Sequence, residues 1–187
     1  MVGNSLALDC FISEREILID AAGWSDLLLG AVIGAIKPPN PMLMERRIPT
    51  SSFQAPNFSN KKYLGDAVKI ADEIVAVMKP DDKTCFKVCS EYILSGVRFH
   101  LQNRGFNVQT VESTGELKAM VERAYIRWCV EAGVPEEMLR DKRRFWTLLD
   151  WVSEKPNLRE GLVKTGWASW GQKWREEIFK RNQNPQP

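Results

Sequence analysis

The 187-residue chain contains a single histidine and four cysteines, and these small numbers exclude several kinds of site. One histidine cannot form the histidine pair of a zinc protease, and without supporting partners it cannot complete a catalytic triad. The closest cysteines, Cys85 and Cys89, have three residues between them, whereas zinc knuckles and redox motifs usually have two. We therefore predict reduced core cysteines and a structural or surface role for His100.

Long apolar runs are also missing. The longest, at residues 27–36, is shorter than the roughly 20 residues needed to cross a bilayer, and no basic stretch with a cleavage site precedes it. We expect a soluble, cytoplasmic protein with no membrane partner. The net charge of +2 does not by itself demand a nucleic-acid partner. The sequence contains neither a glycine-rich nucleotide fingerprint nor a serine in a nucleophile elbow.

The chain does contain enough apolar residues for a core. Hydrophobic residues make up 44% of it and charged residues 27%, which suits a globular protein. Gly133 and Pro135 are strong helix stop signals. We predict an α/β core domain over residues 1–134 and a helical, tryptophan-rich extension over residues 135–187 that packs on this core.

The pattern in the first half predicts mainly strands. Residues 26–37 fit either a buried strand or a buried helix capped by Ser25, and we favour the strand. Asp20 ends the strand before this run, and prolines interrupt the chain after it. Residues 49–62 lack periodicity and predict a long exposed loop. The predicted strands are residues 6–12, 17–20, 26–37 and 42–48.

Helices and strands alternate in the second half. Apolar residues recur at helical spacing through residues 62–78, and Pro80 closes this helix. Gly105 ends a second helix. The predicted elements after the first helix are a strand at 84–90, a helix at 95–104, a strand at 106–111, a helix at 114–132 and further helices over 136–180.

Three tryptophans of the extension share one helical face. Trp167, Trp170 and Trp174 are spaced i, i+3 and i+7. Packing against the core explains this spacing, and we favour that interpretation. The alternative is a stacking surface for bases, because Lys173 and Arg175 interleave with the rings.

This order of elements resembles the ribonuclease H-like superfamily, which includes type 2 ribonucleases H, Holliday-junction resolvases and related nucleases. The resemblance covers about residues 17–133. Its local part is LIDAAGWSDLLLGAVIGAI, residues 18–36, which looks like the first-strand aspartate, small-residue turn and second strand of those nucleases. It implies an α/β, ribonuclease H-like fold, with a mixed sheet, helical crossovers and a helical C-terminal extension.

In that superfamily, acids on the first strand, at the end of the fourth strand and after the fifth strand or on a later helix hold two divalent cations. Such hard cations bind oxygen ligands and serve phosphodiester cleavage. Asp20 matches the first position and Glu91 the second, while Glu112 and Glu116 are preferred over Asp141 for the third. The resemblance thus implies Mg or Mn bound by Asp20, Glu91 and Glu112, with Glu116 as a further catalytic candidate.

The chain departs from type 2 ribonucleases H beside the aspartate. Those enzymes carry a second acid and a Gly-Arg-Gly turn, where this chain has Ala21 and the sequence Gly23-Trp24-Ser25. Each candidate acid also has an ordinary structural role. Asp20 can cap the following turn, and the glutamates can favour a helix N-terminus.

The leading hypothesis is a metal-dependent nucleic-acid-processing protein that hydrolyses phosphodiesters. Nucleic acid is then the partner, and the loop at 49–62 covers the cleft. One alternative is a non-catalytic interaction module that keeps the fold and docks through its tryptophans. Another is a small-molecule enzyme that uses the loop as a lid. The predicted phosphate-binding residues are Lys142, Arg143, Arg144, Lys173 and Arg175.

Overall fold

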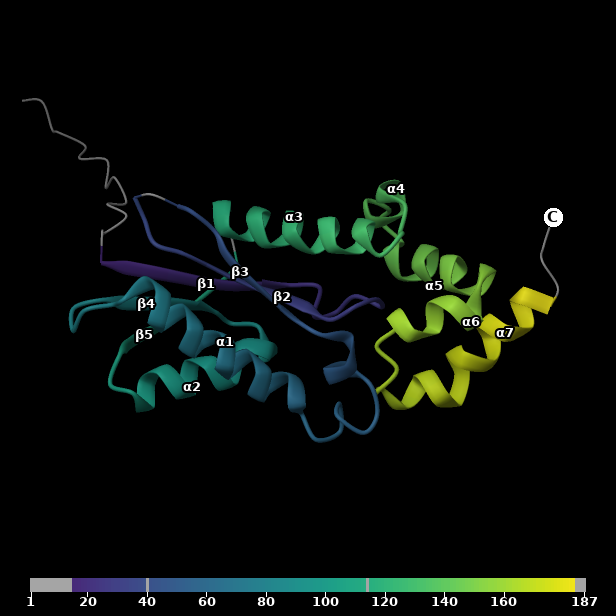
Figure 1. Cartoon of the computed structure of the whole chain (residues 1–187), viewed down its shortest axis with the longest axis horizontal. Coiled ribbons are helices and arrows are strands. Elements are labelled where there is room, and N and C mark those ends of the chain that lie inside the picture. The colour runs from purple at the N-terminus through teal and green to yellow at the C-terminus, as the bar shows by residue number, and fades with distance from the viewer. Residues whose placement is uncertain (1–14, 40, 114, 184–187) are drawn as a thin grey trace, which may run out of the picture.

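Five strands form one mixed sheet (Figure 1). The computed structural model describes residues 15–39, 41–113 and 115–183. The strand order is β3-β2-β1-β4-β5, in which the first three strands make an antiparallel meander and β4 and β5 continue from β1 in parallel. The strands are β1 (Glu16–Ala22), β2 (Ala31–Ile36), β3 (Met44–Ile48), β4 (Cys85–Cys89) and β5 (Asn107–Val111).

The central strand β1 has apolar residues on both faces. Ile17 and Ile19 join the core on one side of the sheet, and Ala22 joins the core on the other. Every residue of β2 is buried, as expected for a strand covered on both faces. The strand favoured for residues 26–37 is therefore confirmed over Ala31–Ile36.

Two helices cover one face of the sheet and a third covers the other (Figure 1). Ile70 and Ile74 of the first helix and Val97 and Leu101 of the second lie in one core. Val121 of the third lies in the other core, which the extension shares. These helices are α1 (Lys62–Met78), α2 (Ser95–Asn103) and α3 (Gly115–Glu131).

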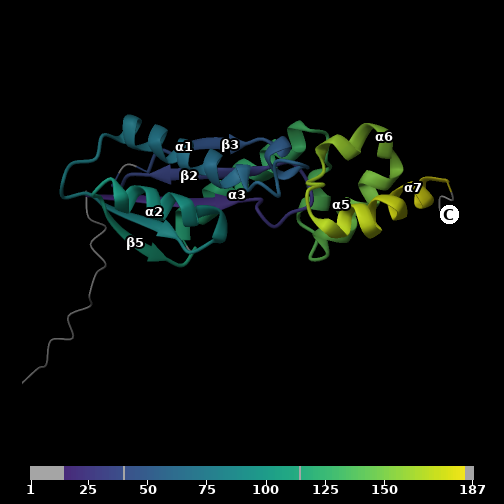
Figure 2. The same cartoon turned by 90° about the horizontal axis from the view of Figure 1, so that it is seen from below.

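The chain after α3 folds into short helices that form one end of the molecule (Figure 2). Leu148, Val163 and Trp170 of this extension are at most 2% exposed, in the same core as α3. Val163 also pairs with Leu28, between β1 and β2, in an isolated antiparallel bridge. The elements are α4 (Glu136–Leu139), α5 (Arg144–Glu154), α6 (Pro156–Arg159), the 3-10 turn η3 (Glu160–Leu162), the π-helical turn η4 (Trp170–Trp174) and α7 (Arg175–Gln183).

The predicted α/β class is confirmed. The sheet is a mixed sheet, with helical crossovers from β3 to β4 and from β4 to β5 and helices after β5. The predicted strand at 6–12, with Cys10, lies outside the described residues. Cys89 and Cys129 are free and buried, as expected, and His100 contacts Asp72 at 2.8 Å in a partly exposed pair. In the described ranges, no helix is long and apolar enough to span a membrane.

The prediction of an exposed loop at residues 49–62 is wrong for part of that segment. It contains the 3-10 turn η1 (Thr50–Phe53), in which Ser52 and Phe53 are buried. The Phe53 ring stacks on Tyr63 with 5.3 Å between ring centroids. Isolated aromatic residues among polar ones give no periodic signal, so sequence patterns miss this packing.

A substitution at Gly30 tests the contact between the loop before β2 and the end of β3. A Cβ atom at Gly30 would lie 1.7 Å from the backbone oxygen of Ile48, so a side chain there forces the backbone apart. We expect Gly30→Ala to lower the free energy of unfolding by at least about 2 kcal/mol. Gly65→Ala is the control, because open space surrounds Gly65 within α1; it should raise stability by about 0.5–1 kcal/mol. Urea denaturation measures both, and equal effects would contradict the expected clash.

Candidate functional site

Asp20 lies in the central strand with only 3% of its surface exposed. Its Oδ1 accepts a hydrogen bond from the backbone N–H of Ala21 at 2.8 Å. Its Oδ2 accepts one at 2.5 Å from the hydroxyl of Ser113, which follows β5. A buried carboxylate needs such partners, and these fix its position.

The parallel pairing of β1 with β4 brings two further groups to Asp20. Ile19 lies opposite Val88, so Cys89 and Glu91 follow at the same end of the sheet. An oxygen of Asp20, the Sγ of Cys89 and an oxygen of Glu91 all lie within 4.8 Å of one another. Three groups this close can share one cation. The sequence-predicted pair Asp20 and Glu91 is thus brought together.

The surroundings of Glu91 and Cys89 favour the neutral forms of these two side chains. Burial raises the pKa of Glu91, and the negative charge of Asp20 raises it further. Burial also raises the pKa of the Cys89 thiol. A cation bound between the groups would lower the pKa of Glu91, since it stabilises the ionised carboxylate.

Two small cavities meet at Ser113, which lines both. One of about 190 Å³ contains Asp20, Cys89 and Glu112 in its wall. The other, of about 150 Å³, is lined by residues from the turn after β1, from α3 and from the extension. Its polar and aromatic lining residues are Trp24, Ser25, Asp26, Glu91, Ser113, Lys118, Glu122 and Arg144.

The other predicted acids lie in different surroundings. Glu112 is exposed, at the cavity that contains Asp20. Glu116 is exposed in the first turn of α3 and lines neither cavity. Asp141 accepts hydrogen bonds from the backbone N–H of Arg143 at 2.8 Å and from the Thr147 hydroxyl at 2.7 Å. The hydrogen bond from Arg143 is the main cause of the lowered pKa of Asp141. These contacts of Asp141 stabilise the start of α5.

Sequence reasoning missed Glu122, an acid on α3. It lines the same cavity as Glu91, and its charge contributes to the raised pKa of Glu91. Lys118 and Glu122 are four residues apart, beside the buried Leu117 and Val121. This i, i+4 spacing next to an apolar stripe was the available signal.

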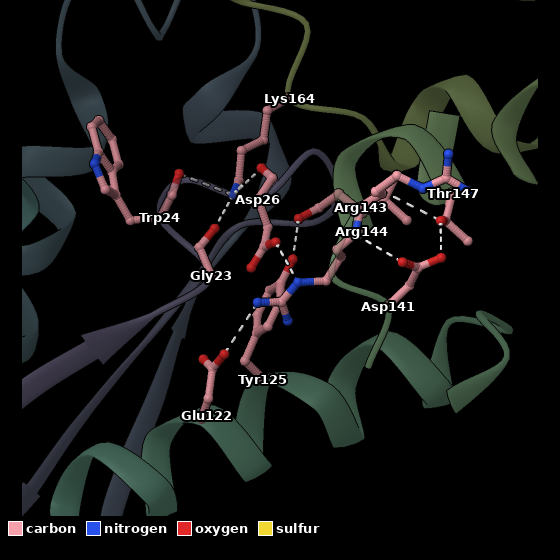
Figure 3. Close-up of polar contacts among 11 residues, drawn as sticks. Gly23, Trp24, Asp26, Glu122, Tyr125, Asp141, Arg143, Arg144, Thr147 and Lys164 are labelled. Carbon is pink, nitrogen blue, oxygen red and sulfur yellow. Dashed lines mark hydrogen bonds and ion pairs between the residues drawn. The ribbon is translucent and has the colours of Figure 1, made fainter. Parts of the chain in front are cut away.

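Arg144, a residue of the extension, lines this cavity with its positively charged side chain (Figure 3). Its Nε lies 3.0 Å from Oδ1 of Asp26, and a terminal nitrogen lies 3.3 Å from Oε1 of Glu122. Burial raises the pKa of Asp26, while Arg144 and Lys164 lower it. Of the five predicted basic residues, Arg144 is the one that lines a cavity with these acids, and it is already paired with two of them.

The remaining predicted basic residues lie elsewhere. Lys142 and Arg143 are exposed before α5. Lys173 lies over the Trp174 ring at 4.3 Å, and Arg175 pairs with Glu160 at 2.7 Å. The rings of Trp167 and Trp174 pack against Phe145, and Trp170 is buried, so these tryptophans contribute to the core of the extension.

Lys164 connects the extension by hydrogen bonds to the turn that follows Asp20 (Figure 3). Its Nζ donates to the backbone oxygen of Gly23, to that of Asp26 at 2.9 Å and to that of Trp24 at 3.3 Å. Burial lowers its pKa to about 7, although the charges of Asp26 and Cys129 oppose this shift. One side chain thus fixes the turn that carries Trp24 and Asp26 into the cavity.

Comparison with known proteins gives a likeness to solved structures alone. No family model matches the chain, and no curated protein matches it. Among solved structures, it is similar to the catalytic core domain of BIV integrase, with 11% identity and a TM-score of 0.37. The match covers 90% of this chain and 99% of that one. A likeness at this level carries no functional argument.

Lys164 makes stability depend on pH. Its pKa in the folded chain, about 7, lies below the ordinary 10.5, so the unfolded chain binds more protons between these values. The free energy of unfolding should therefore rise with pH in this window, by at most about 1.4 kcal/mol per pH unit. Lys164→Met should remove that rise, whereas Lys155→Met, at an exposed site, should keep it. Urea denaturation at several pH values measures this, and parallel curves for all three proteins would refute the assignment.

Proposed function

We propose that the protein processes nucleic acid with bound Mg²⁺ or Mn²⁺ and hydrolyses phosphodiester bonds. The observation that supports this most is the approach of Asp20 and Glu91 to within 4.8 Å. Asp20 lies on β1, and Glu91 follows the parallel neighbouring strand β4, far away in the sequence. Glu91 and Asp20 each line one of the two small cavities, and Glu91 is partly exposed. Divalent cations there would activate a water molecule and stabilise the leaving oxygen.

The chemistry of the cluster fits a hard cation. Asp20 and Glu91 offer the oxygen ligands that Mg²⁺ and Mn²⁺ prefer. Cys89 is a soft ligand, and burial raises the pKa of its thiol, which disfavours the thiolate form that binds metals. Cys89 therefore packs beside the carboxylates, and the carboxylates bind the ion.

Glu112 is our proposed third ligand. It lines the cavity of Asp20 and has its carboxylate at an exposed position, where it can turn toward an ion. Glu122 is the competing choice, since it lines the cavity of Glu91. Its carboxylate contacts Arg144, however, so binding a cation there requires that contact to be exchanged.

A non-catalytic interaction module remains the second candidate function. Ala21 lies where type 2 ribonucleases H have a second acid, so this site has one carboxylate fewer than theirs. Arg144 also pairs with both Asp26 and Glu122 without any ion. A module of this kind keeps the fold and binds no metal.

Calorimetric titration with Mn²⁺ tests the site. Asp20→Asn and Glu91→Gln should each weaken Mn²⁺ binding by at least about tenfold, because each removes a direct ligand. Glu116→Gln should bind as the wild type does, since Glu116 lines neither cavity. Absence of Mn²⁺ binding by the wild type, or indifference to Asp20→Asn, would favour the interaction module.

The same titration assigns the third ligand. Glu112→Gln should weaken Mn²⁺ binding, whereas Glu122→Gln should leave it within about twofold of the wild type, well under the loss expected for a direct ligand. The reverse result would transfer the role to Glu122. Cleavage of labelled single-stranded, duplex and branched substrates, followed with the same variants, tests the hydrolytic step separately from ion binding.

Cys89→Ser tests the choice of metal. The thiol is not a ligand in this proposal, so the variant should keep the Mn²⁺ affinity of the wild type. If the site selects a softer ion, Zn²⁺ affinity should exceed Mn²⁺ affinity in the wild type and fall sharply in Cys89→Ser. That pattern would contradict a Mg²⁺ or Mn²⁺ site.

A further inference from the structure

A cluster of aromatic rings borders the carboxylate cavity. We call it the aromatic cluster; its members are Trp24, Phe53, Phe58, Tyr63 and Tyr92, joined by ring contacts with centroids 5.0 to 6.0 Å apart. Trp24 lines the cavity that contains Glu91. Tyr92 follows Glu91 directly, at the start of the 3-10 turn η2 (Tyr92–Leu94). The cluster is thus an immediate neighbour of the proposed metal site.

Tyr92 is the outer ring of this cluster. Phe53 and Tyr63 are buried, at 1% and 4% exposed, whereas Tyr92 is 47% exposed. Its ring lies against Trp24, with 6.0 Å between the centroids, so it is supported from within the cluster. A large ring held in place with one side in solvent is a stacking surface for a base.

Positive charge accompanies this ring. The Nζ of Lys61 lies 6.0 Å from the centre of the Tyr92 ring, and a hydrogen bond to Tyr92 raises the pKa of Lys61. Lys61 precedes α1, whose first turn has no acidic residue, so the positive end of the helix dipole adds to its charge. Lys118 lines the neighbouring cavity. Phosphate groups are attracted to such a surface.

We propose that the aromatic cluster binds single-stranded nucleic acid, with an unpaired base stacked on Tyr92 and an adjacent phosphate at Lys61. A duplex fits this surface poorly, because its bases already stack on one another and offer no free face. A strand bound in this way passes Glu91, the residue before Tyr92. The inference names the substrate of the proposed hydrolytic site and rests on that function for cleavage, while the binding itself requires no metal.

The test measures binding without cleavage. Fluorescence anisotropy follows labelled oligothymidylate or oligouridylate of about twelve nucleotides, in EDTA. The background is the Asp20→Asn, Glu91→Gln double variant, which removes both the metal ligands and their repulsion of phosphates. Should that variant not fold, wild-type protein in EDTA provides the same comparison. DNA and RNA probes then show which sugar the surface prefers.

Tyr92→Ala should weaken single-strand binding by about 5- to 150-fold, the range of one lost stacking contact. Tyr92→Trp should keep the affinity. Phe99→Ala is the matched control, because Phe99 is an exposed aromatic residue on α2, 66% exposed, outside the aromatic cluster. Equal affinities for Tyr92→Ala and Phe99→Ala, equally tight binding of duplex, or no binding at all would overturn the proposal.

The salt dependence of binding by Lys61→Gln is an independent test of the binding surface. Loss of one phosphate contact should reduce the slope of log affinity against log salt by about 0.7 for a single strand. An unchanged slope would remove Lys61 from the binding surface. Because these measurements use no divalent cation, they stand or fall separately from Mn²⁺ titration of the wild type. Tyr92-dependent binding together with no Mn²⁺ binding would identify a single-strand binding module.

Discussion

The parallel pairing of β1 with β4 is the contact on which the candidate site depends. Ile19 opposite Val88 fixes the register, so the residue after Ile19 and the residues after Val88 meet at the same end of the sheet. Asp20 and Glu91 are 71 positions apart in the sequence, and no local interaction could bring them together. A shift of one residue would turn Asp20 to the opposite face. The strand register therefore determines the chemistry.

The covering of β1 on both faces has an electrostatic consequence. Asp20 is 3% exposed and is held by Ser113 and its neighbouring backbone. Glu91 lies next to this charge in a partly buried position, so its pKa rises. The region thus concentrates negative charge where solvent screens it weakly. A cation bound there would favour the ionised form of Glu91.

The sequence predicted what periodicity and turn chemistry encode. The helix at Lys62–Met78, the strands around Asp20 and Cys89 and the alternation that follows all came from apolar spacing and stop signals. The pairing of Asp20 with Glu91 came from resemblance alone, because spacing says nothing about which strands are neighbours. Glu122 was missed since an acid beside an apolar helix stripe is usually a solvated residue. The buried role of Lys164 has no signal in the sequence, because its three carbonyl partners come together only in the folded chain.

The extension is part of the site because its charges enter the cavity. Arg144 contacts Asp26 and Glu122, and Lys164 holds the turn between Gly23 and Asp26. These contacts offset carboxylate repulsion in the absence of ions, which stabilises the fold around a cavity rich in acids. Under the proposed function, a phosphate in this cavity would compete with the same carboxylates for Arg144. Substrate binding and the packing of the extension would then depend on the same guanidinium group, so the two equilibria would be linked.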